Sequence, residues 1–180
     1  MSERVETRPE RLDHASANEF LDRYLGLLNE RDVRHIPTLY TADIEFQDDG
    51  WPEIVHGHAE MERFLSTLWH AVPDCHFEIL EGPYLSAHGR RLAARLRVSG
   101  TASGPLAPPG YAPTDGRVAT EIGAFYELEG DRVKRARIII NMNDIGIQLG
   151  AAPAPGSRGE RLVVVMQRLT ARRMRRCAAG

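Results

Sequence analysis

The sequence predicts an α+β domain in which helices come first and an antiparallel sheet follows. Before Pro73, apolar residues recur every three or four positions, as expected for helices with one buried face. After Pro73 they alternate with polar residues in successive runs, which is typical of strands with one face against a core. A sheet that curls around the preceding helices would leave a pocket between the two layers.

Each element follows from its local pattern. In the first helix, Phe20, Tyr24 and Leu28 lie four residues apart, and the next long helix stops before Pro73. Glycine and charged residues at 129–133 indicate a tight hairpin, whereas 103–116 is too rich in proline and glycine for regular structure. The expected helices are 16–29, 33–40 and 58–72, and the expected strands are 44–48, 75–79, 91–99, 118–127 and 133–142.

Four segments are expected along the chain. Residues 1–14 form a flexible lead-in and 15–150 form the folded domain. The sequence AAPAPGS at 151–157 has the composition of a linker. Residues 158–180 then form a basic amphipathic helix, which makes the predicted architecture a single domain with a C-terminal helical extension.

The charge of the chain is unevenly distributed. The net charge is −2, but the first 157 residues carry 16 basic and 24 acidic side chains, while the tail carries seven arginines and one glutamate. An acidic domain does not suit nucleic-acid binding. Neither a signal-peptide core nor an apolar run long enough to cross a bilayer is present, so the expected location is the cytoplasm.

The arginine-rich tail allows two interpretations. Leu162, Val165, Met166 and Leu169 form a short apolar stripe among the arginines, as in helices that meet a membrane or a nucleic acid. Alternatively, the helix packs on its own acidic domain or on a second subunit. The second interpretation is favoured, because the stripe is short and the domain carries the matching negative charge. We therefore expect neither a membrane nor a nucleic-acid partner.

Metal and cofactor chemistry have little support in the sequence. His56 and His58 form a His-x-His pair, but Gly57 separates them where a loop becomes a helix, so a shared face is not expected. Nucleophile-elbow, phosphate-loop and dinucleotide-binding glycine motifs do not occur. Cys75 and Cys177 are interpreted as free thiols. The expectation is a protein without metal or cofactor, which leaves acid–base chemistry or binding alone.

Asp48 and Tyr24 are the first candidates for acid–base chemistry. Asp48 shares a strand face with Ile44 and Phe46, and a carboxylate among apolar groups has a raised pKa. The alternative is that Asp48 merely opens the following turn. Tyr24 lies on the apolar stripe of the first helix, where its phenol would donate a hydrogen bond into a cavity; the alternative is a core tyrosine.

The segment IIINMNDIGIQLG at 138–150 turns abruptly from apolar to polar. Asn141 and Asn143 share a predicted strand face with Ile139, and this face is expected to look into the pocket. Buried amides need hydrogen-bond partners, which a ligand can supply. Asn141 therefore joins the catalytic candidates, and a further group of residues is expected to bind the substrate. This group consists of Trp51, Trp69, Phe46, Asn143 and Asp144.

The order of these elements resembles the SnoaL-like polyketide cyclases over about residues 17–150. The resemblance is carried by LYTADIEFQDDGWPEIVHGHAEMERFL, AVPDCHFEI, APTDGRVATEIGAFYELEGDRVKRARIII and QLG. It implies a cone-shaped fold, shared with nuclear transport factor two and ketosteroid isomerases, and a homodimer. In these cyclases an aspartate seven residues before the glutamine of Gln-Leu-Gly is the general acid and base. That position is Asn141 here, and Asp144 is the nearest carboxylate.

The similarity to ketosteroid isomerases concerns other positions. That family uses a tyrosine on the first helix as oxyanion donor and an aspartate on the first strand as base, and these positions match Tyr24 and Asp48. The protonated acid that the isomerases carry on a later strand has no counterpart, because the match falls near Gly123.

These observations predict a cofactor-independent acid–base enzyme of bacterial secondary metabolism that acts on a small hydrophobic, oxygenated substrate such as a polyketide. Cyclisation, isomerisation and hydration are all compatible with one base and two hydrogen-bond donors. The alternative is a non-catalytic binding or dimerisation module of the same fold, which the amide at 141 favours. Whether the chain is an enzyme therefore stays open at the level of sequence.

Overall fold

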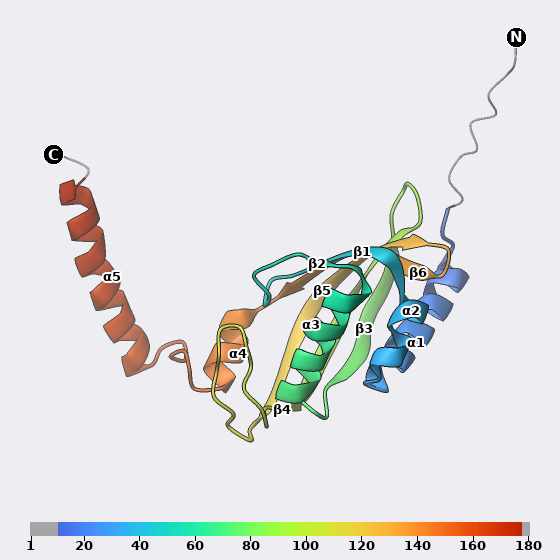
Figure 1. Ribbon diagram of the computed structural model, residues 1–180. Helices are drawn as coiled ribbons and strands as arrows, with labels where there is room; N and C mark the ends of the chain where they lie inside the picture. The colour runs from blue at the N-terminus through green and yellow to red at the C-terminus, as the bar shows by residue number, and fades with distance from the viewer. Residues whose placement is uncertain (1–10, 178–180) are drawn as a thin grey trace, which may run out of the picture.

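The computed structural model describes residues 11–177 and confirms the α+β class. Helices lead the chain, a long sheet follows, and a separate helix ends it (Figure 1). The helical elements are α1 (His14–Asn29), the 3-10 helix η1 (Val33–His35), α2 (Ile36–Leu39), α3 (Gly57–Ala71), α4 (Met142–Gln148) and α5 (Arg158–Cys177). The strands are β1 (Tyr40–Asp48), β2 (Val55–His56), β3 (His76–Leu85), β4 (Arg91–Thr101), β5 (Arg117–Glu129) and β6 (Arg132–Ile140).

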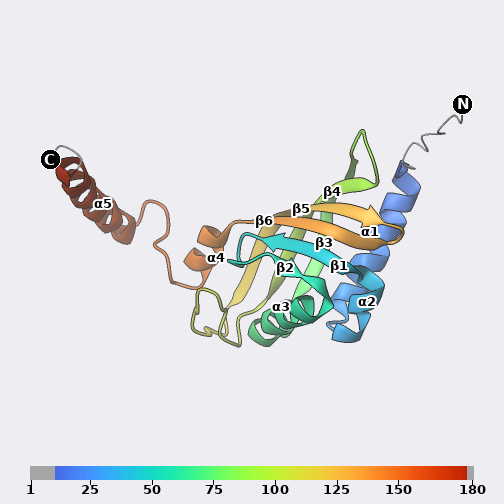
Figure 2. The same cartoon turned by 45° about the horizontal axis from the view of Figure 1, so that its top comes forward.

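The six strands form one mixed sheet in the order β2-β1-β6-β5-β4-β3. β1 and β6 run parallel, and every other neighbouring pair is antiparallel. The pairing of β3 with β4 shifts register twice, and such irregularities bend a sheet. Helices α1, α2 and α3 lie against one face of the sheet (Figure 2). The core therefore lies between the three helices and this concave face.

Alternation in the long strands determines which side chains enter the core. In β5, Thr120, Ile122, Ala124, Tyr126 and Leu128 are buried, while the residues between them are partly or fully exposed. The outer face of the sheet is uncovered and carries a few half-exposed apolar side chains, namely Tyr84, Phe125 and Ile139. A homodimer would need a surface of this kind, and it stays a prediction.

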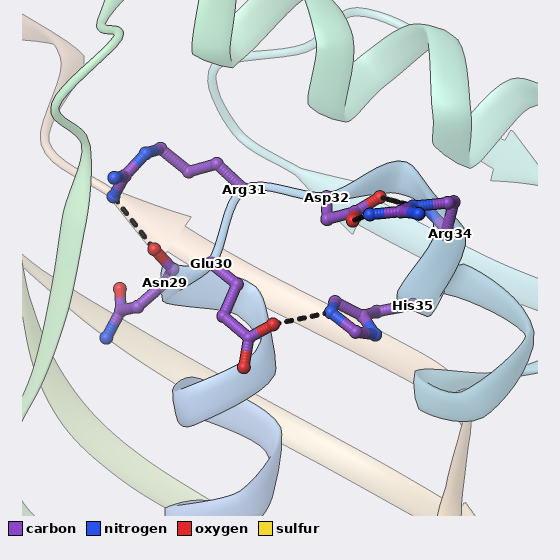
Figure 3. A network of polar contacts seen from close by, with 6 residues as sticks. All are labelled: Asn29, Glu30, Arg31, Asp32, Arg34 and His35. Atoms are coloured by element: carbon purple, nitrogen blue, oxygen red, sulfur yellow. Dashed lines mark hydrogen bonds and ion pairs between the residues drawn. The ribbon is translucent and has the colours of Figure 1, made fainter.

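The turn after α1 connects the helical layer to the start of β3. Arg31 adopts a positive φ of 56°, which reverses the chain directly after the helix. Its guanidinium donates to the carbonyl oxygen of Asn29 at 2.8 Å (Figure 3) and to that of Cys75 at 3.1 Å. The amide of Asn29 also pairs with both backbone groups of Phe77, at 2.8 and 2.9 Å. These bonds satisfy polar groups at the helix end and fix the first strand of the antiparallel meander.

The boundaries of the folded part differ in detail from the predicted ones. Of the lead-in expected over 1–14, residues 1–10 lie outside the described residues, whereas Leu12 is buried and α1 begins at His14. Its N-cap is Asp13, whose carboxylate accepts from the backbone amide of Ser16 at 2.7 Å. The last strand ends at Ile140 rather than Met142, and the following segment forms α4, a helix that the sequence analysis did not predict.

The C-terminal helix stands clear of the domain. α5 begins at Arg158, as predicted, and projects away from the sheet and helices (Figure 1). The part of the tail after Cys177 lies outside the described residues. In the described chain, no helix is both long enough and apolar enough to span a bilayer.

Candidate active-site cavity

A cavity of about 150 Å³ lies between the helices and the concave face of the sheet. Nearly all of its lining is apolar, and Asp48 is the one charged side chain among the described residues that line it. The tyrosines at its wall are Tyr24, Tyr40 and Tyr126. Its apolar lining includes Leu25, Leu28, Phe46, Trp51, Phe64, Leu65, Leu68, Phe77, Leu96, Val98, Ile122, Ile138, Ile140, Met142, Ile145 and Leu149.

Asp48 is the last residue of β1 and faces the cavity, as its spacing from Phe46 predicted. One carboxylate oxygen, Oδ1, accepts a hydrogen bond from the backbone N–H of Gly50 at 2.6 Å. Burial raises the pKa of Asp48 to about 6, although the Gly50 bond opposes that shift. The negative charge of Asp49 adds to the rise, and Arg137 counters it. Asp48 can therefore gain or lose a proton close to neutral pH.

The neighbouring Asp49 has a different environment, although it is also an aspartate. It lies on the exposed side of the sheet and forms an ion pair with Arg137 of β6. Because successive residues of a strand point to opposite faces, only one of the two carboxylates can enter the cavity. The register that pairs Asp48 with Ile138 places that carboxylate at the concave face.

Three buried tyrosines form a cluster at the wall of the cavity. The hydroxyl groups of Tyr24 and Tyr40 lie 2.8 Å apart and share a hydrogen bond, in which either can donate. The ring of Tyr126 packs against that of Tyr24 with centroids 5.3 Å apart. Burial raises the pKa of Tyr40 to about 12 and moves the pKa values of Tyr24 and Tyr126 upward as well. The phenols thus stay protonated and can donate hydrogen bonds.

Aromatic side chains form the wall beside Asp48. Phe46 and Phe64 pack with ring centroids 5.0 Å apart, and Trp51 meets Phe64 edge-on at 5.3 Å. Phe46 and Trp51 both line the cavity, in agreement with their selection as candidates. Trp69 is not a lining residue; it packs beside the buried cluster of Ala71, Val72 and Cys75. The structure therefore gives Trp69 a packing role.

Two segments close one end of the cavity. The helix α4 contributes Met142 and Ile145, and Leu149 follows directly after it; the apolar side chains of all three line the cavity. The segment 103–116, which forms no helix or strand, contributes its residues 106–108. Backbone amides of Ser103 and Gly104 donate to the carbonyl oxygen of Ala71 at 3.1 and 3.0 Å. These bonds attach the segment to the end of α3 and so hold it over the cavity.

The comparisons with known proteins agree with this fold. A model of the SnoaL-like domain matches residues 21–136. The chain belongs to the SnoaL-like family. This SnoaL-like protein is similar in structure to TsrD from Streptomyces laurentii, with 21% identity and a TM-score of 0.65 over 78% of this chain and 98% of that one.

Two further solved structures resemble the SnoaL-like protein. A SnoaL-like polyketide cyclase from Agrobacterium tumefaciens shares 26% identity, with a TM-score of 0.57 over 74% of this chain and 97% of that one. A protein of ketosteroid isomerase-like fold from Catenulispora acidiphila shares 14% identity, with a TM-score of 0.62 over 77% of this chain and 97% of that one. No curated protein matches the chain at a significant level.

The expectation that Ile139 and Asn141 look into the cavity is wrong. Ile139 is 48% exposed on the outer face of the sheet, whereas Ile138 is 6% exposed and lines the cavity together with Ile140. Asn141 is exposed and caps α4, where its side-chain oxygen accepts from the backbone amide of Asp144 at 3.1 Å. The amide at the family acid position therefore serves to start a helix of this SnoaL-like protein.

The other polar residues of this segment also stabilise α4. The side-chain amide of Gln148 bonds both backbone groups of Ala119 in β5, at 2.9 and 2.8 Å, and donates to Asp144 at 2.9 Å. Asn143 is exposed, and neither it nor Asp144 lines the cavity. The Gln-Leu-Gly segment thus attaches α4 to the sheet, while the apolar side of α4 faces the cavity.

Two tyrosines of the cavity wall were not among the residues selected from the sequence. Tyr40 and Tyr126 complete the cluster around Tyr24, although neither was selected as a candidate. The signal for Tyr40 was its even spacing from Ile44, Phe46 and Asp48 along one strand. Only the tertiary structure brings β1 and β5 against α1, so the cluster could not be assembled from separate segments.

Thiol and metal chemistry find no support in the described residues. Burial raises the pKa of Cys75 to about 12, which keeps the thiol protonated and unreactive as a nucleophile. Across residues 11–177, no group of three or more histidine, cysteine, aspartate or glutamate side chains could hold a metal ion. The titratable groups of the described cavity lining are Asp48, the three tyrosine phenols and the Cys75 thiol.

Proposed function

We propose that this protein is a cofactor-independent acid–base enzyme in which Asp48 removes a proton from a small hydrophobic, oxygenated substrate of polyketide type. The observation that carries the proposal is a single cavity-lining carboxylate whose pKa lies at about 6. A general base is most effective when its pKa lies near the working pH. The proposal places this enzyme in bacterial secondary metabolism.

The proposed step is the deprotonation of an activated carbon next to a carbonyl group. The C–H bond breaks, its proton moves to the Asp48 carboxylate, and its electron pair delocalises onto the carbonyl oxygen as an enolate. Protonated Asp48 then returns the proton to the same or another atom. Cyclisation, isomerisation and hydration share this exchange and differ in the atom at which the intermediate reacts.

The tyrosine cluster supplies the matching hydrogen-bond donor. In the Tyr24–Tyr40 pair one hydroxyl donates to the other, and the accepting hydroxyl keeps its own proton free for the substrate oxygen. A donor placed in an apolar cavity stabilises a developing oxyanion more than it would in water. The raised pKa values favour donation without loss of the phenol proton.

The lining also limits the substrate class. Apart from Asp48 the described lining residues are uncharged, so a substrate with a free phosphate group would lose its hydration without gaining a cationic partner. The aromatic wall of Phe46, Trp51 and Phe64 suits a flat, largely apolar molecule. A neutral ring-containing ketone fits both conditions.

The titration of Asp48 tests the proposal directly. We expect proton exchange at the acidic carbon of a hydrophobic 1,3-diketone in deuterated buffer to rise with pH, with its midpoint near 6, because only the ionised carboxylate accepts a proton. The ¹³C chemical shift of the Asp48 side-chain carboxyl group, followed by NMR against pH, should show the same midpoint. A midpoint at the ordinary aspartate value, or exchange no faster than in buffer alone, would contradict the assignment.

Tyr24→Phe tests the oxyanion donor. Loss of this donor is expected to slow exchange by about 10²–10³-fold, because Tyr24 is the residue assigned to the enolate oxygen. Tyr126→Phe is the matched control, because it removes a phenol from the same cluster while retaining the Tyr24–Tyr40 bond, and a smaller effect is expected. Equal slowing by both changes would assign the effect to general disruption of the cluster, and circular dichroism would report loss of folding.

A non-catalytic binding module remains the competing function. Asn141 occupies the position of the family acid and caps a helix instead. Among the described lining residues, Asp48 is therefore the one acid, which favours this alternative. Under this alternative the diketone binds, its exchange rate stays at the buffer value, and Asp48 contributes only to affinity.

A further inference from the structure

The helix α5 presents an apolar surface that nothing covers in the described chain. Its large hydrophobic side chains are between 42% and 68% exposed. They are Leu162, Val163, Val164, Val165, Met166, Leu169 and Met174. Scattered single exposures of this kind are ordinary, but their concentration on one helix marks a contact surface.

Over residues 161–172, the leucine and methionine side chains of α5 lie on a different face from the arginines, whereas Arg158 and Arg173 fall on the line of the apolar stripe. Leu162, Met166 and Leu169 fall at positions i, i+4 and i+7, which form one stripe of a helix. Arg161, Arg168, Arg172 and Arg175 are spaced by seven, four and three residues and form another stripe. All four arginines are exposed, and none takes part in an ion pair among the described residues. The helix is therefore both amphipathic and strongly basic.

The outer face of the sheet offers these arginines few free acidic partners. On the outer face of the sheet, each acidic side chain near the exposed apolar residues already has an arginine partner from the same sheet. The pairs are Arg91–Glu127, Arg95–Glu81, Arg95–Glu121, Arg97–Glu78, Arg135–Glu45 and Arg137–Asp49. An α5 helix that docked on this face of a second copy would bring its arginines beside other arginines, which disfavours that partner.

Because α5 stands clear of the domain (Figure 1), in contrast to the packing expected from the sequence, we propose that it binds the surface of an anionic lipid membrane. Its apolar stripe would enter the boundary between headgroups and acyl chains, and its arginines would meet the phosphate groups, as in interfacial amphipathic helices. The linker 151–157 leaves the domain free of the surface, which suits an acidic domain that an anionic membrane repels. A nucleic acid would use the arginines but would leave the apolar stripe uncovered.

Vesicle co-sedimentation of the full chain tests this proposal. At low salt the protein should sediment with vesicles of mixed phosphatidylglycerol and phosphatidylcholine, remain in solution with pure phosphatidylcholine, and be released as salt is added. Arg168→Gln and Arg172→Gln should each weaken binding by about fivefold. No sedimentation with the anionic vesicles would overturn the proposal.

A matched pair of apolar changes separates lipid insertion from simple charge attraction. Met166→Gln removes an apolar side chain from the stripe and should weaken vesicle binding about tenfold. Val164 lies four residues before Arg168, on the side of the helix that carries the arginines. Val164→Gln therefore removes an apolar side chain outside the stripe and should change vesicle binding by no more than about twofold. Both leave the charge unchanged. Equal effects would overturn insertion of the stripe.

Two other partners would give distinct results. If α5 pairs two copies of the chain, deletion of 158–180 halves the mass in light scattering and the full chain does not sediment with vesicles. If α5 binds nucleic acid, duplex DNA retains the chain at physiological salt and Met166→Gln has no effect on it. Either result, in the absence of vesicle binding, overturns the proposal.

Discussion

Replacement of Asp48 by asparagine is expected to abolish base-dependent turnover and, at about pH 8, to raise the free energy of unfolding by about 2–3 kcal/mol. Both effects have the same physical origin. The carboxylate is held in an apolar cavity that disfavours its charge, which makes it a stronger base and also destabilises the folded state. An amide can still accept the hydrogen bond from Gly50 but carries no charge.

The sign of the stability effect follows from proton linkage. Burial raises the pKa of Asp48 from 3.8 in the unfolded chain to about 6 in the folded protein. Between these values the folded state binds more protons than the unfolded state, so Asp48 makes the protein less stable as pH rises through this window. Above the folded pKa the full penalty is present, and below the unfolded pKa it disappears. Asp48→Asn should therefore stabilise at alkaline pH and be nearly neutral in acid.

Urea denaturation at two pH values measures this difference, and Asp49→Asn is the matched control. Asp49 carries the same carboxylate one residue later but lies outside the cavity in a pair with Arg137. Its replacement should leave proton exchange within about twofold and cost at most about 1 kcal/mol, the range for exposed ion pairs. If Asp48→Asn leaves turnover intact, or destabilises the protein at alkaline pH, Asp48 is not a buried base.

A second large effect is expected at Gly104, where the segment over the cavity meets the end of α3. A Cβ atom on Gly104 would lie 2.3 Å from the carbonyl oxygen of His70 and 3.1 Å from Cα of Ala71, and both of these are backbone atoms. The clash can be relieved only by a shift of the segment, which would break its amide bonds to Ala71. Gly104→Ala should therefore reduce the free energy of unfolding by about 2–3 kcal/mol.

The same variant should also weaken ligand binding, since residues 106–108 line the cavity. Urea denaturation and titration with the diketone measure the two effects. Gly26→Ala in α1 is the control, because no heavy atom lies within 4 Å of its added Cβ; alanine there should stabilise by about 0.5–1 kcal/mol through helix propensity. Unchanged stability of Gly104→Ala would mean that the segment is not held against α3.

Of Asp13, Asp48 and Asp74, only Asp48 combines a raised pKa, which suits a general base, with a cost to the stability of the folded state. Other aspartates of the chain, such as Asp13 and Asp74, accept backbone hydrogen bonds that lower their pKa values, and neither lines the cavity. Asp48 accepts only one such bond against a larger desolvation. Its position at the end of β1 lets it accept the bond from Gly50, two residues later. No cationic side chain lies among the described residues that line the cavity, so nothing on that side compensates the charge.

Local periodicity was sufficient where one face of an element is clearly apolar. Tyr24 could be assigned to the buried stripe of α1 and Asp48 to the face of Ile44 and Phe46, because helix and strand periods are fixed by backbone geometry. Both assignments agree with the cavity lining. The family resemblance then supplied candidate roles for these positions, and those roles remain to be measured.

Periodicity failed at the end of the last strand for an identifiable reason. Three successive isoleucines, 138–140, provide no alternation, so the inward face cannot be read from them. In β6, Val133 and Ala136 are both buried although they are three residues apart, and the pairing with β5 shifts register in this region. A one-residue shift exchanges the two faces of a strand, which is why Asn141 was assigned to the wrong side.

The sequence alone determined the α+β class, the order of the long helices and strands, and the face on which Tyr24, Phe46 and Asp48 lie, because these depend on short-range patterns. Only the tertiary structure decided that Tyr40 and Tyr126 join Tyr24, that α4 closes the cavity, and that α5 stands clear of the domain. These features depend on which distant segments meet, and the raised pKa of Asp48 exists only once those segments exclude water from its carboxylate.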